Sequence, residues 1–197
     1  MSAIVRAIEN DKKLDKAAKV YAGWSGAVTK PKALKNLLSG GWLGHQLHPM
    51  LTDLPIGAWG AATFLDLTAG EKGAAAAQRL VGAGLLATVP TAMSGANDYA
   101  DTYGAEQRIG FVHGMTNVVG AGFQAASWLA RRRGNRALGI VLSGVGFGIT
   151  SGAAYLGGHL TLVRGIGVNH TAYHDNVGDW TDVAALDDLT DGTPHKV

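Results

Sequence analysis

Two histidines three residues apart, His45 and His48, open the most distinctive stretch of the chain, which reads GWLGHQLHPMLTDLPIGAWG over residues 41–60. A proline follows the second histidine directly, and an apolar run follows the proline. Neutral imidazole is the commonest metal ligand in proteins and a good ligand of haem iron. The stretch therefore predicts a metal or haem ligand at the point where an apolar helix begins.

The composition excludes several other kinds of chemistry. The chain has no cysteine, which removes disulfides, thiolate metal sites, covalent c-type haem attachment and iron–sulfur ligation by cysteine. The formal net charge of +2 is too small to predict a nucleic-acid partner. Hydrophobic residues make up 47% of the chain and charged residues only 16%, against roughly 25% charged in average soluble domains.

Four apolar runs have the length of a membrane span, which is about 20 residues. The runs cover residues 49–69, 80–96, 110–130 and 137–157. Only Asp53 and Asp66 are charged inside them. A soluble helical bundle would show a polar stripe of Lys and Glu every three or four residues, and these runs do not. The sequence therefore predicts an all-α integral membrane protein that crosses the cell membrane four times.

The order of these runs predicts the organisation of the whole chain. Short connections at residues 70–79, 97–109 and 131–136 require the helices to run up and down as an antiparallel four-helix bundle. The predicted domains are an amphipathic, basic N-terminal segment (1–40), a four-span membrane domain (41–160) and a polar tail (161–197). The N-terminal segment predicts one helix, at the membrane surface or packed on the domain, and a shorter helix near residues 33–38.

Glycines recur at helical spacing on the predicted spans. Gly144, Gly148 and Gly152 are four residues apart, and Gly110 and Gly114 repeat this spacing. In lipid, such spacing lets helix backbones approach closely. A glycine face also leaves room for a flat cofactor, so two interpretations of the glycines stay open.

The up-and-down topology brings four histidines to one level near one membrane face. His45 and His48 start the first run, His113 lies about one turn into the third, and His159 follows the end of the fourth. Asp53 lies near the same level. Ionisable groups at membrane depth are costly and by default indicate a functional site.

The leading hypothesis for this layer is a b-type haem in a membrane electron-transfer subunit. Two facing histidines would give a six-coordinate haem, drawn from a ligand pool of His45, His48, His113 and His159. His113 is the first choice because it is the deepest. His48 is its expected partner because Pro49 fixes the backbone after it and starts the helix.

Two other functions stay open. Three or four histidines with a carboxylate would suit zinc, copper or non-haem iron, in a binding protein or in an enzyme. The residues of that alternative are His45, His48, His113, His159 and Asp53. A cofactor-free structural or assembly subunit is the third possibility, with the histidines serving only helix ends and lipid headgroups. An acid–base relay of His and Asp for protons is a further interpretation of the same layer.

The segment GGWLGHQLHPMLTDLPIGAW (residues 40–59) resembles the signature of a four-helix membrane family, the domain of unknown function 2231. The resemblance continues through NDYADTYGAEQRIGFVHGMTNVV (97–119) and AAYLGGHLTLVRGIGVNHTAY (153–173). The four histidines of the predicted layer all lie within these motifs. The resemblance therefore covers nearly the whole chain and implies a four-helix membrane fold.

Relatives in that family are often joined to Rieske iron–sulfur or cytochrome c modules. The tail DWTDVAALDDLTDGTPHKV (179–197) resembles the linker and first strand that open a Rieske domain, without the Cys–His motifs of that domain. The resemblance thus implies an electron-transfer setting. The expected partners are the lipid bilayer, a separate redox protein of Rieske or cytochrome type, and a quinone.

Overall fold

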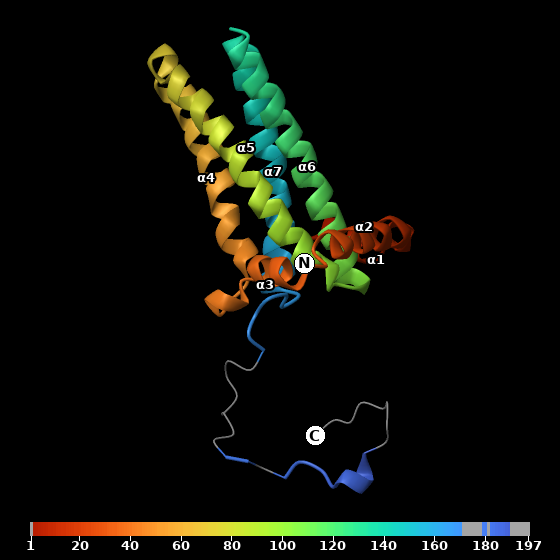
Figure 1. Ribbon diagram of the computed structural model, residues 1–197. Helices are drawn as coiled ribbons and strands as arrows, with labels where there is room; N and C mark the ends of the chain where they lie inside the picture. Colours follow the sequence, from red (N-terminus) through yellow and green to blue (C-terminus); the bar gives the residue numbers. More distant parts are fainter. Residues whose placement is uncertain (1, 171–178, 181, 190–197) are drawn as a thin grey trace.

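The computed structural model describes residues 2–170, 179–180 and 182–189. Four long helices lie side by side and alternate in direction (Figure 1). They are α4 (Leu47–Thr68), α5 (Gly70–Ala100), α6 (Gly104–Arg132) and α7 (Arg136–Leu162). The described part of the chain contains helices and turns but no strand. The all-α prediction is therefore confirmed, and the long helices follow the predicted up-and-down order.

The bundle consists of two helical hairpins. Helix α4 packs most extensively on α5, and α6 on α7, whereas contact between the hairpins is more limited. In Figure 1 the turns within the hairpins lie at the upper end of the bundle. The turn from α5 to α6 and the end of α7 lie at the lower end. Both hairpins therefore point the same way.

Three short helices lie at the lower end of the bundle (Figure 1). They are α1 (Ala3–Asn10), α2 (Asp15–Val28) and α3 (Lys32–Ser39). The sequence predicted only two helices in this segment and missed α1. The Tyr99 hydroxyl on α5 donates a hydrogen bond of 3.0 Å to the Ala18 carbonyl, which fixes α2 to the bundle.

Two predicted connections are largely helical, and those predictions were wrong. Residues 70–79 form the first turns of α5, and only residues 101–103 separate α5 from α6. The stretch GEKGAAAAQR is rich in alanine, the strongest helix former. Gly70 and Gly104 have φ of 52° and 62°, so the chain reverses at a residue that tolerates the left-handed region. The turn between α6 and α7 spans only residues 133–135.

The long helices have the dimensions of membrane spans. The shortest, α4, has 22 residues and is therefore about 33 Å long, against a hydrocarbon thickness of about 30 Å. Within the described residues one helix, α7, is apolar enough over its length to cross a membrane by composition alone. Crossing by all four helices stays a prediction.

The glycines at 144, 148 and 152 do not pack helices together. A Cβ atom at any of these three positions would meet nothing within 4 Å, so the glycines face outward. The prediction of close packing was therefore wrong for them. It was correct for Gly110, where a Cβ would lie 2.8 Å from the Tyr99 ring.

A buried ion pair joins the hairpins at the upper end. Asp66 on α4 and Arg131 on α6 each have a side chain that is 2% exposed. The Arg131 Nη1 group donates to Asp66 Oδ1 at 3.0 Å, and Nη2 donates to the other carboxylate oxygen. Arg131 Nε also donates to Ser127 Oγ at 3.2 Å. The sequence placed Arg131 in a connection, but α6 continues through it and turns it inward.

Replacing either member of this pair by leucine should destabilise the bundle. D66L leaves the buried Arg131 without its carboxylate, and breaking such a pair typically costs about 3–5 kcal/mol. R131L should cost less than D66L, because Asp66 keeps Arg136 at 3.6 Å. The double variant D66L/R131L should recover most of that loss because neither charge remains. The free energy of unfolding in detergent measures all three. Losses that simply add in the double variant would contradict the coupling.

Candidate functional site

Two of the predicted histidines meet between the hairpins. His48 lies in the first turn of α4, and His113 lies in the third turn of α6. Their ring centres are 6.4 Å apart, and the ring planes are at 88° to each other. Each histidine comes from the first helix of its hairpin. The predicted meeting of these two histidines is therefore present in the structure.

Each imidazole is held by a backbone carbonyl of the second helix in its own hairpin. His48 Nδ1 lies 3.0 Å from the Thr91 carbonyl oxygen on α5, and His113 Nδ1 lies 2.7 Å from the Ala153 carbonyl oxygen on α7. A carbonyl oxygen only accepts, so Nδ1–H donates in both cases. In a neutral imidazole the Nε2 atom then carries the free lone pair. Such an outer hydrogen bond is typical of histidines that bind metal or haem iron.

A glycine lies behind each ring. A Cβ atom at Gly95 would lie 2.7 Å from Cε1 of His48, and a Cβ at Gly157 would lie 2.9 Å from Cε1 of His113. Contacts below 3.0 Å force one of the groups to move. Helices α5 and α7 therefore each contribute a carbonyl acceptor and, four residues later, the space for the imidazole.

The two hairpins repeat one arrangement. A spacing of 65 residues separates His48 from His113 (113 − 48) and also Asp66 from Arg131. In the second helices, VGAGLLATVPTAMSG (81–95) corresponds to SGVGFGITSGAAYLG (143–157), with three Gly, one Thr and one Ala shared in register. This repeat was missed from the sequence because few residues are identical. The motif His-x-Met, which occurs at residues 48–50 and again at 113–115, is the sequence signal that indicates the repeat.

The repeat extends along the bundle beyond the histidines. About three turns further along α4, Trp59 Nε1 donates to the Val81 carbonyl at 3.3 Å. At the equivalent place in the second hairpin, Gln124 Nε2 donates to the Ser143 carbonyl at 3.1 Å. Both side chains are buried. Each hairpin is thus fastened internally by two side chains that donate to carbonyls of its second helix.

A cavity of about 480 Å³ lies between the hairpins, and both histidines line it. This volume is within the range of about 300–1,000 Å³ that is typical of ligand sites. Trp59 lines its deeper part, and Gln46 and Ile166 line it toward the lower end. All four long helices contribute to the lining. The cavity can therefore hold a ligand that touches both hairpins at once.

Polar atoms in this cavity have unused hydrogen-bonding capacity. Thr150 Oγ1 and Asp98 Oδ2 are buried and have no hydrogen-bond partner within the residues that the structure describes. The Asn117 amide nitrogen lies 3.3 Å from Nε2 of His113, so this amide would have to turn away when a metal binds that nitrogen. Unpaired buried polar groups cost free energy, which a bound ligand with matching groups would reduce.

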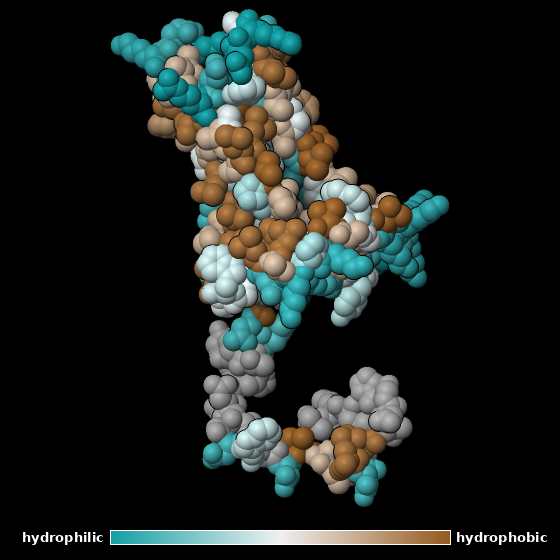
Figure 2. Space-filling model, in the orientation of Figure 1, coloured by the Kyte–Doolittle hydropathy of each residue, from teal (hydrophilic) through white to brown (hydrophobic). Residues whose placement is uncertain are grey.

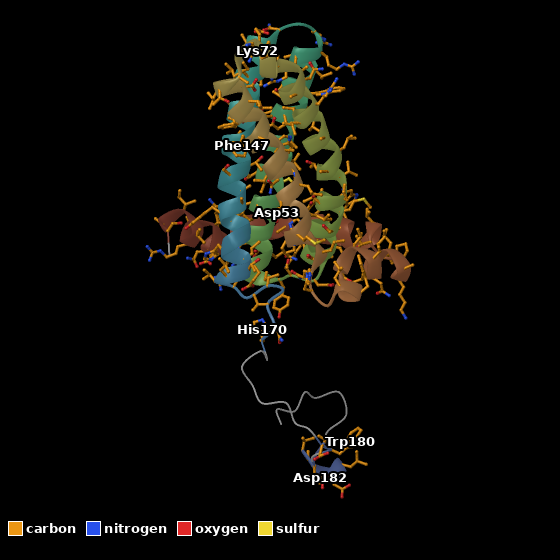
Figure 3. All side chains as sticks on the ribbon, turned by 90° about the vertical axis from the view of Figure 1, so that its left-hand side faces the viewer. Asp53, Lys72, Phe147, His170, Trp180 and Asp182 are labelled. Atoms are coloured by element: carbon orange, nitrogen blue, oxygen red, sulfur yellow. The ribbon has the colours of Figure 1, made fainter. Side chains whose placement is uncertain are left out.

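The other predicted ligands lie elsewhere. His45 precedes α4 and is exposed, with Nδ1 3.0 Å from the Gln46 carbonyl oxygen. Asp53 is exposed on the outer side of α4 (Figure 3). Five residues along a helix turn the side chain by about 140°, so Asp53 points away from the direction of His48. Within the described residues, no group of three or more His, Cys, Asp and Glu could hold a metal ion.

His159 belongs to a buried ionic network, not to the histidine pair. Its Nε2–H donates to Glu9 Oε1 at 3.2 Å, and Arg164 Nη2 binds the same oxygen at 2.6 Å. Arg164 also reaches Glu106 at 3.5 Å. Burial alone would raise the pKa of Glu9. The hydrogen bonds from Arg164 and His159 outweigh burial and lower that pKa from its ordinary value of 4.5. The network joins α1 to the end of α7.

The remaining histidines belong to the tail. His170 is exposed, and its Nε2 lies 3.0 Å from the Gly165 carbonyl oxygen. His174 and His195 lie outside the described residues, as do residues 181 and 190–197 of the segment that resembles the start of a Rieske module.

Residues 44–170 match the model of the DUF2231 family, which is described as a predicted membrane protein. The chain belongs to this family. The matched residues of this DUF2231 protein include all four long helices and both histidines of the pair. No curated protein and no solved structure is similar enough to match it. The family description names no activity, so function has to be argued from the site.

Substituting the glycines behind the imidazoles should destabilise the DUF2231 bundle. G95A and G157A each place a methyl group against an imidazole ring, and such overpacking typically costs about 1–3 kcal/mol. G144A is the matched control, because its Cβ would meet nothing within 4 Å and alanine favours helix by about 0.5–1 kcal/mol. Unfolding in detergent compares them. Equal stability of all three variants would contradict the packing described.

The Glu9 network should make stability depend on pH. Because the folded state lowers the pKa of Glu9, its stabilisation is complete above the unfolded value of about 4.5 and is lost as pH falls through the folded pKa. E9Q removes the charge and keeps the shape. The difference in unfolding free energy between wild type and E9Q should therefore shrink below pH 4.5. A difference that stays constant down to strongly acidic pH would contradict the role of the carboxylate.

Proposed function

We propose that this DUF2231 protein is a membrane-embedded redox subunit that binds one b-type haem between its two hairpins, with His48 and His113 as axial ligands. The observation that carries the proposal is the pair of imidazoles, each fixed through Nδ1 by a carbonyl of its own hairpin. Both rings border one cavity. Because Nδ1 of each ring is hydrogen-bonded, Nε2 is the atom that would bind iron.

The separation of the two rings fits this role. A bond from a metal to an imidazole nitrogen is about 2.0 Å and the ring centre lies about 1.1 Å further, so two imidazoles on one metal have centres about 6 Å apart. The observed separation is 6.4 Å. Two imidazoles can coordinate from opposite sides of a haem whether their planes are parallel or perpendicular.

The cavity supports a flat, largely apolar ligand. The side chains of Pro55, Ile56 and Trp59 line its interior. Gly95 and Gly157 let the rings pack closely against α5 and α7, which leaves the space between the hairpins to the ligand. Bound haem would carry single electrons, while the protein sets its burial, ligand geometry and hydrogen bonding.

Insertion of all four long helices in the cell membrane is part of the proposal. In Figure 2 hydrophobic side chains cover the middle of the bundle, and hydrophilic side chains gather at its two ends. The exposed apolar side chains on the long helices include Leu54, Phe64, Leu86, Val89, Val118 and Val141. A surface of this kind is unusual on a soluble monomer and is suited to lipid. The family description as a membrane protein agrees with it.

The electron donor or acceptor would approach the lower end of the bundle. The cavity extends to that end, where Gln46, Glu106 and Ile166 line it. A separate Rieske or cytochrome-type protein, or a quinone, would exchange electrons there with the haem. The non-haem metal alternative is less favoured, because the described residues bring together two imidazoles and not the three or four ligands that such an ion requires.

Absorption spectra of the detergent-purified protein, expressed with ample haem and measured oxidised and reduced, test the proposal. We expect a Soret band with one haem per chain, lost or strongly weakened in H48A and in H113A. H45A is the matched control and should keep the spectrum, because that ring is exposed and apart from the cavity. A haem-free wild type, or stoichiometric zinc, copper or iron without porphyrin, would refute the assignment.

A further inference from the structure

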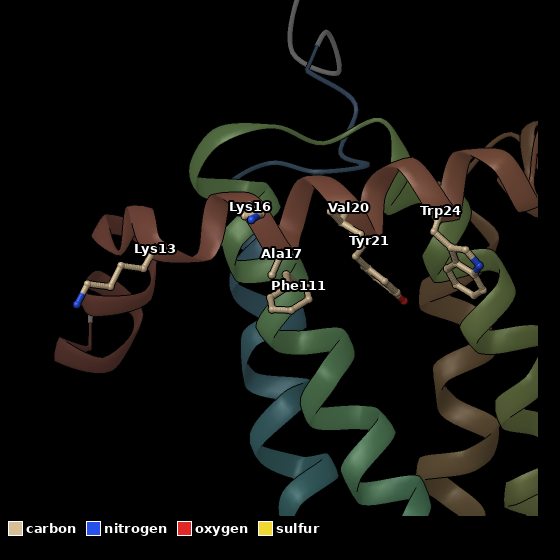
Figure 4. A pocket seen from close by; sticks show the side chains of 7 residues that line it. All are labelled: Lys13, Lys16, Ala17, Val20, Tyr21, Trp24 and Phe111. Carbon is tan, nitrogen blue, oxygen red and sulfur yellow. The ribbon is translucent and has the colours of Figure 1, made fainter.

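A shallow, open groove lies under α2, outside the bundle. It has a volume of about 690 Å³. Figure 4 shows Tyr21 and Trp24 extending from α2 in the direction in which the long helices run, with Phe111 of α6 beside them. Lys13 and Lys16 lie at the opposite rim. The groove is therefore aromatic on the inside and basic at its edge.

The aromatic wall is built by contacts that leave part of it uncovered. The Tyr21 ring lies 5.9 Å from Trp24, 5.0 Å from Tyr99 and 6.0 Å from Phe111, measured between ring centres. Trp24 is nevertheless 58% exposed and the neighbouring Val20 is 69% exposed. Tyr21 is held in place by this packing, whereas Trp24, which stacks on Tyr21 with one side, and Val20 leave most of their apolar surface exposed.

The charge at the edge of this groove is predominantly positive, with the exposed Asp11 as the acidic neighbour of Lys12 and Lys13. Four lysines gather at the start of α2, and all are exposed: Lys12, Lys13, Lys16 and Lys19. None of these four lysines forms an ion pair with another described residue. Among the described lysines, Lys35 does so, with Asp101. Asp15, the acidic residue of α2, is bound by Arg108 at 2.7 Å. The lysines are therefore free to bind an external anion.

We propose that this groove binds an anionic phospholipid, with the phosphate at Lys13 and Lys16 and an acyl chain along Val20, Tyr21 and Trp24. The lysines at the rim match the charged headgroup of such a lipid, and the apolar groove next to them matches its acyl chain. Lysines next to an apolar face are typical of helices that lie in the membrane interface, where anionic headgroups attract them. Tryptophan and tyrosine prefer the same level. The inference rests on the membrane insertion proposed above, but not on haem.

Tryptophan fluorescence in lipid nanodiscs tests the site. The full-length protein is placed in phosphatidylcholine discs that contain an equal mole fraction of either phosphatidylglycerol or phosphatidylcholine with brominated acyl chains. Bromine quenches tryptophan only at short range. We expect stronger quenching by the brominated anionic lipid, with the excess lost in W24F, which removes the reporting side chain.

Charge variants then separate a built site from general attraction. K13Q/K16Q should lose the excess quenching. K30Q/K32Q removes the same charge at the same end of the protein and should keep it. Equal quenching of wild type by both brominated lipids, or an excess that survives in K13Q/K16Q, would overturn the lipid site alone. Quenching by neither lipid would overturn membrane insertion as well, and the haem spectrum is read independently of both results.

Discussion

The hydrogen bond from an imidazole Nδ1–H to a backbone carbonyl across each hairpin determines how the site is built. It fixes the tautomer and the direction of His48 through Thr91, and of His113 through Ala153. It also requires a glycine four residues after each acceptor, since a larger residue would displace the ring. The positions of the two lone pairs thus depend on how closely each pair of helices packs, and not on a loop.

The two hairpins use the same contacts, so the site lies on an approximate two-fold axis that runs along the bundle. The Asp66–Arg131 pair obeys the same spacing of 65 residues and joins the equivalent helices at the upper end. At the lower end, Glu9, His159 and Arg164 fasten the N-terminal segment to the end of α7. The hairpins are therefore linked at one end by a buried ion pair and covered at the other by an ionic network, while the cavity between them stays available for a ligand.

Much of the architecture could be predicted from the sequence. Apolar runs of the right length specify the long helices, and short connections specify their direction, so His48 and His113 could be predicted to share a level. Which way a side chain points around a helix could not be read from level alone. Asp53 points outward. His159 donates to Glu9, which belongs to the N-terminal segment, and the order of the apolar runs does not say where that segment packs. The helix starts at Gly70 and Gly104 could not be predicted, because the charged residues that follow both glycines are as typical of connections as of helix ends.

Electron paramagnetic resonance of the oxidised protein, expressed with ample haem, tests the proposal that each hairpin provides one ligand to a haem iron. The geometry predicts a low-spin ferric signal in the wild type, because imidazole ligands on both faces give six-coordinate iron. Whatever haem H48A or H113A retains should give a high-spin signal instead, and added free imidazole should restore the low-spin form. A high-spin wild type, or a low-spin signal that survives in both single variants, would contradict the pairing of His48 with His113.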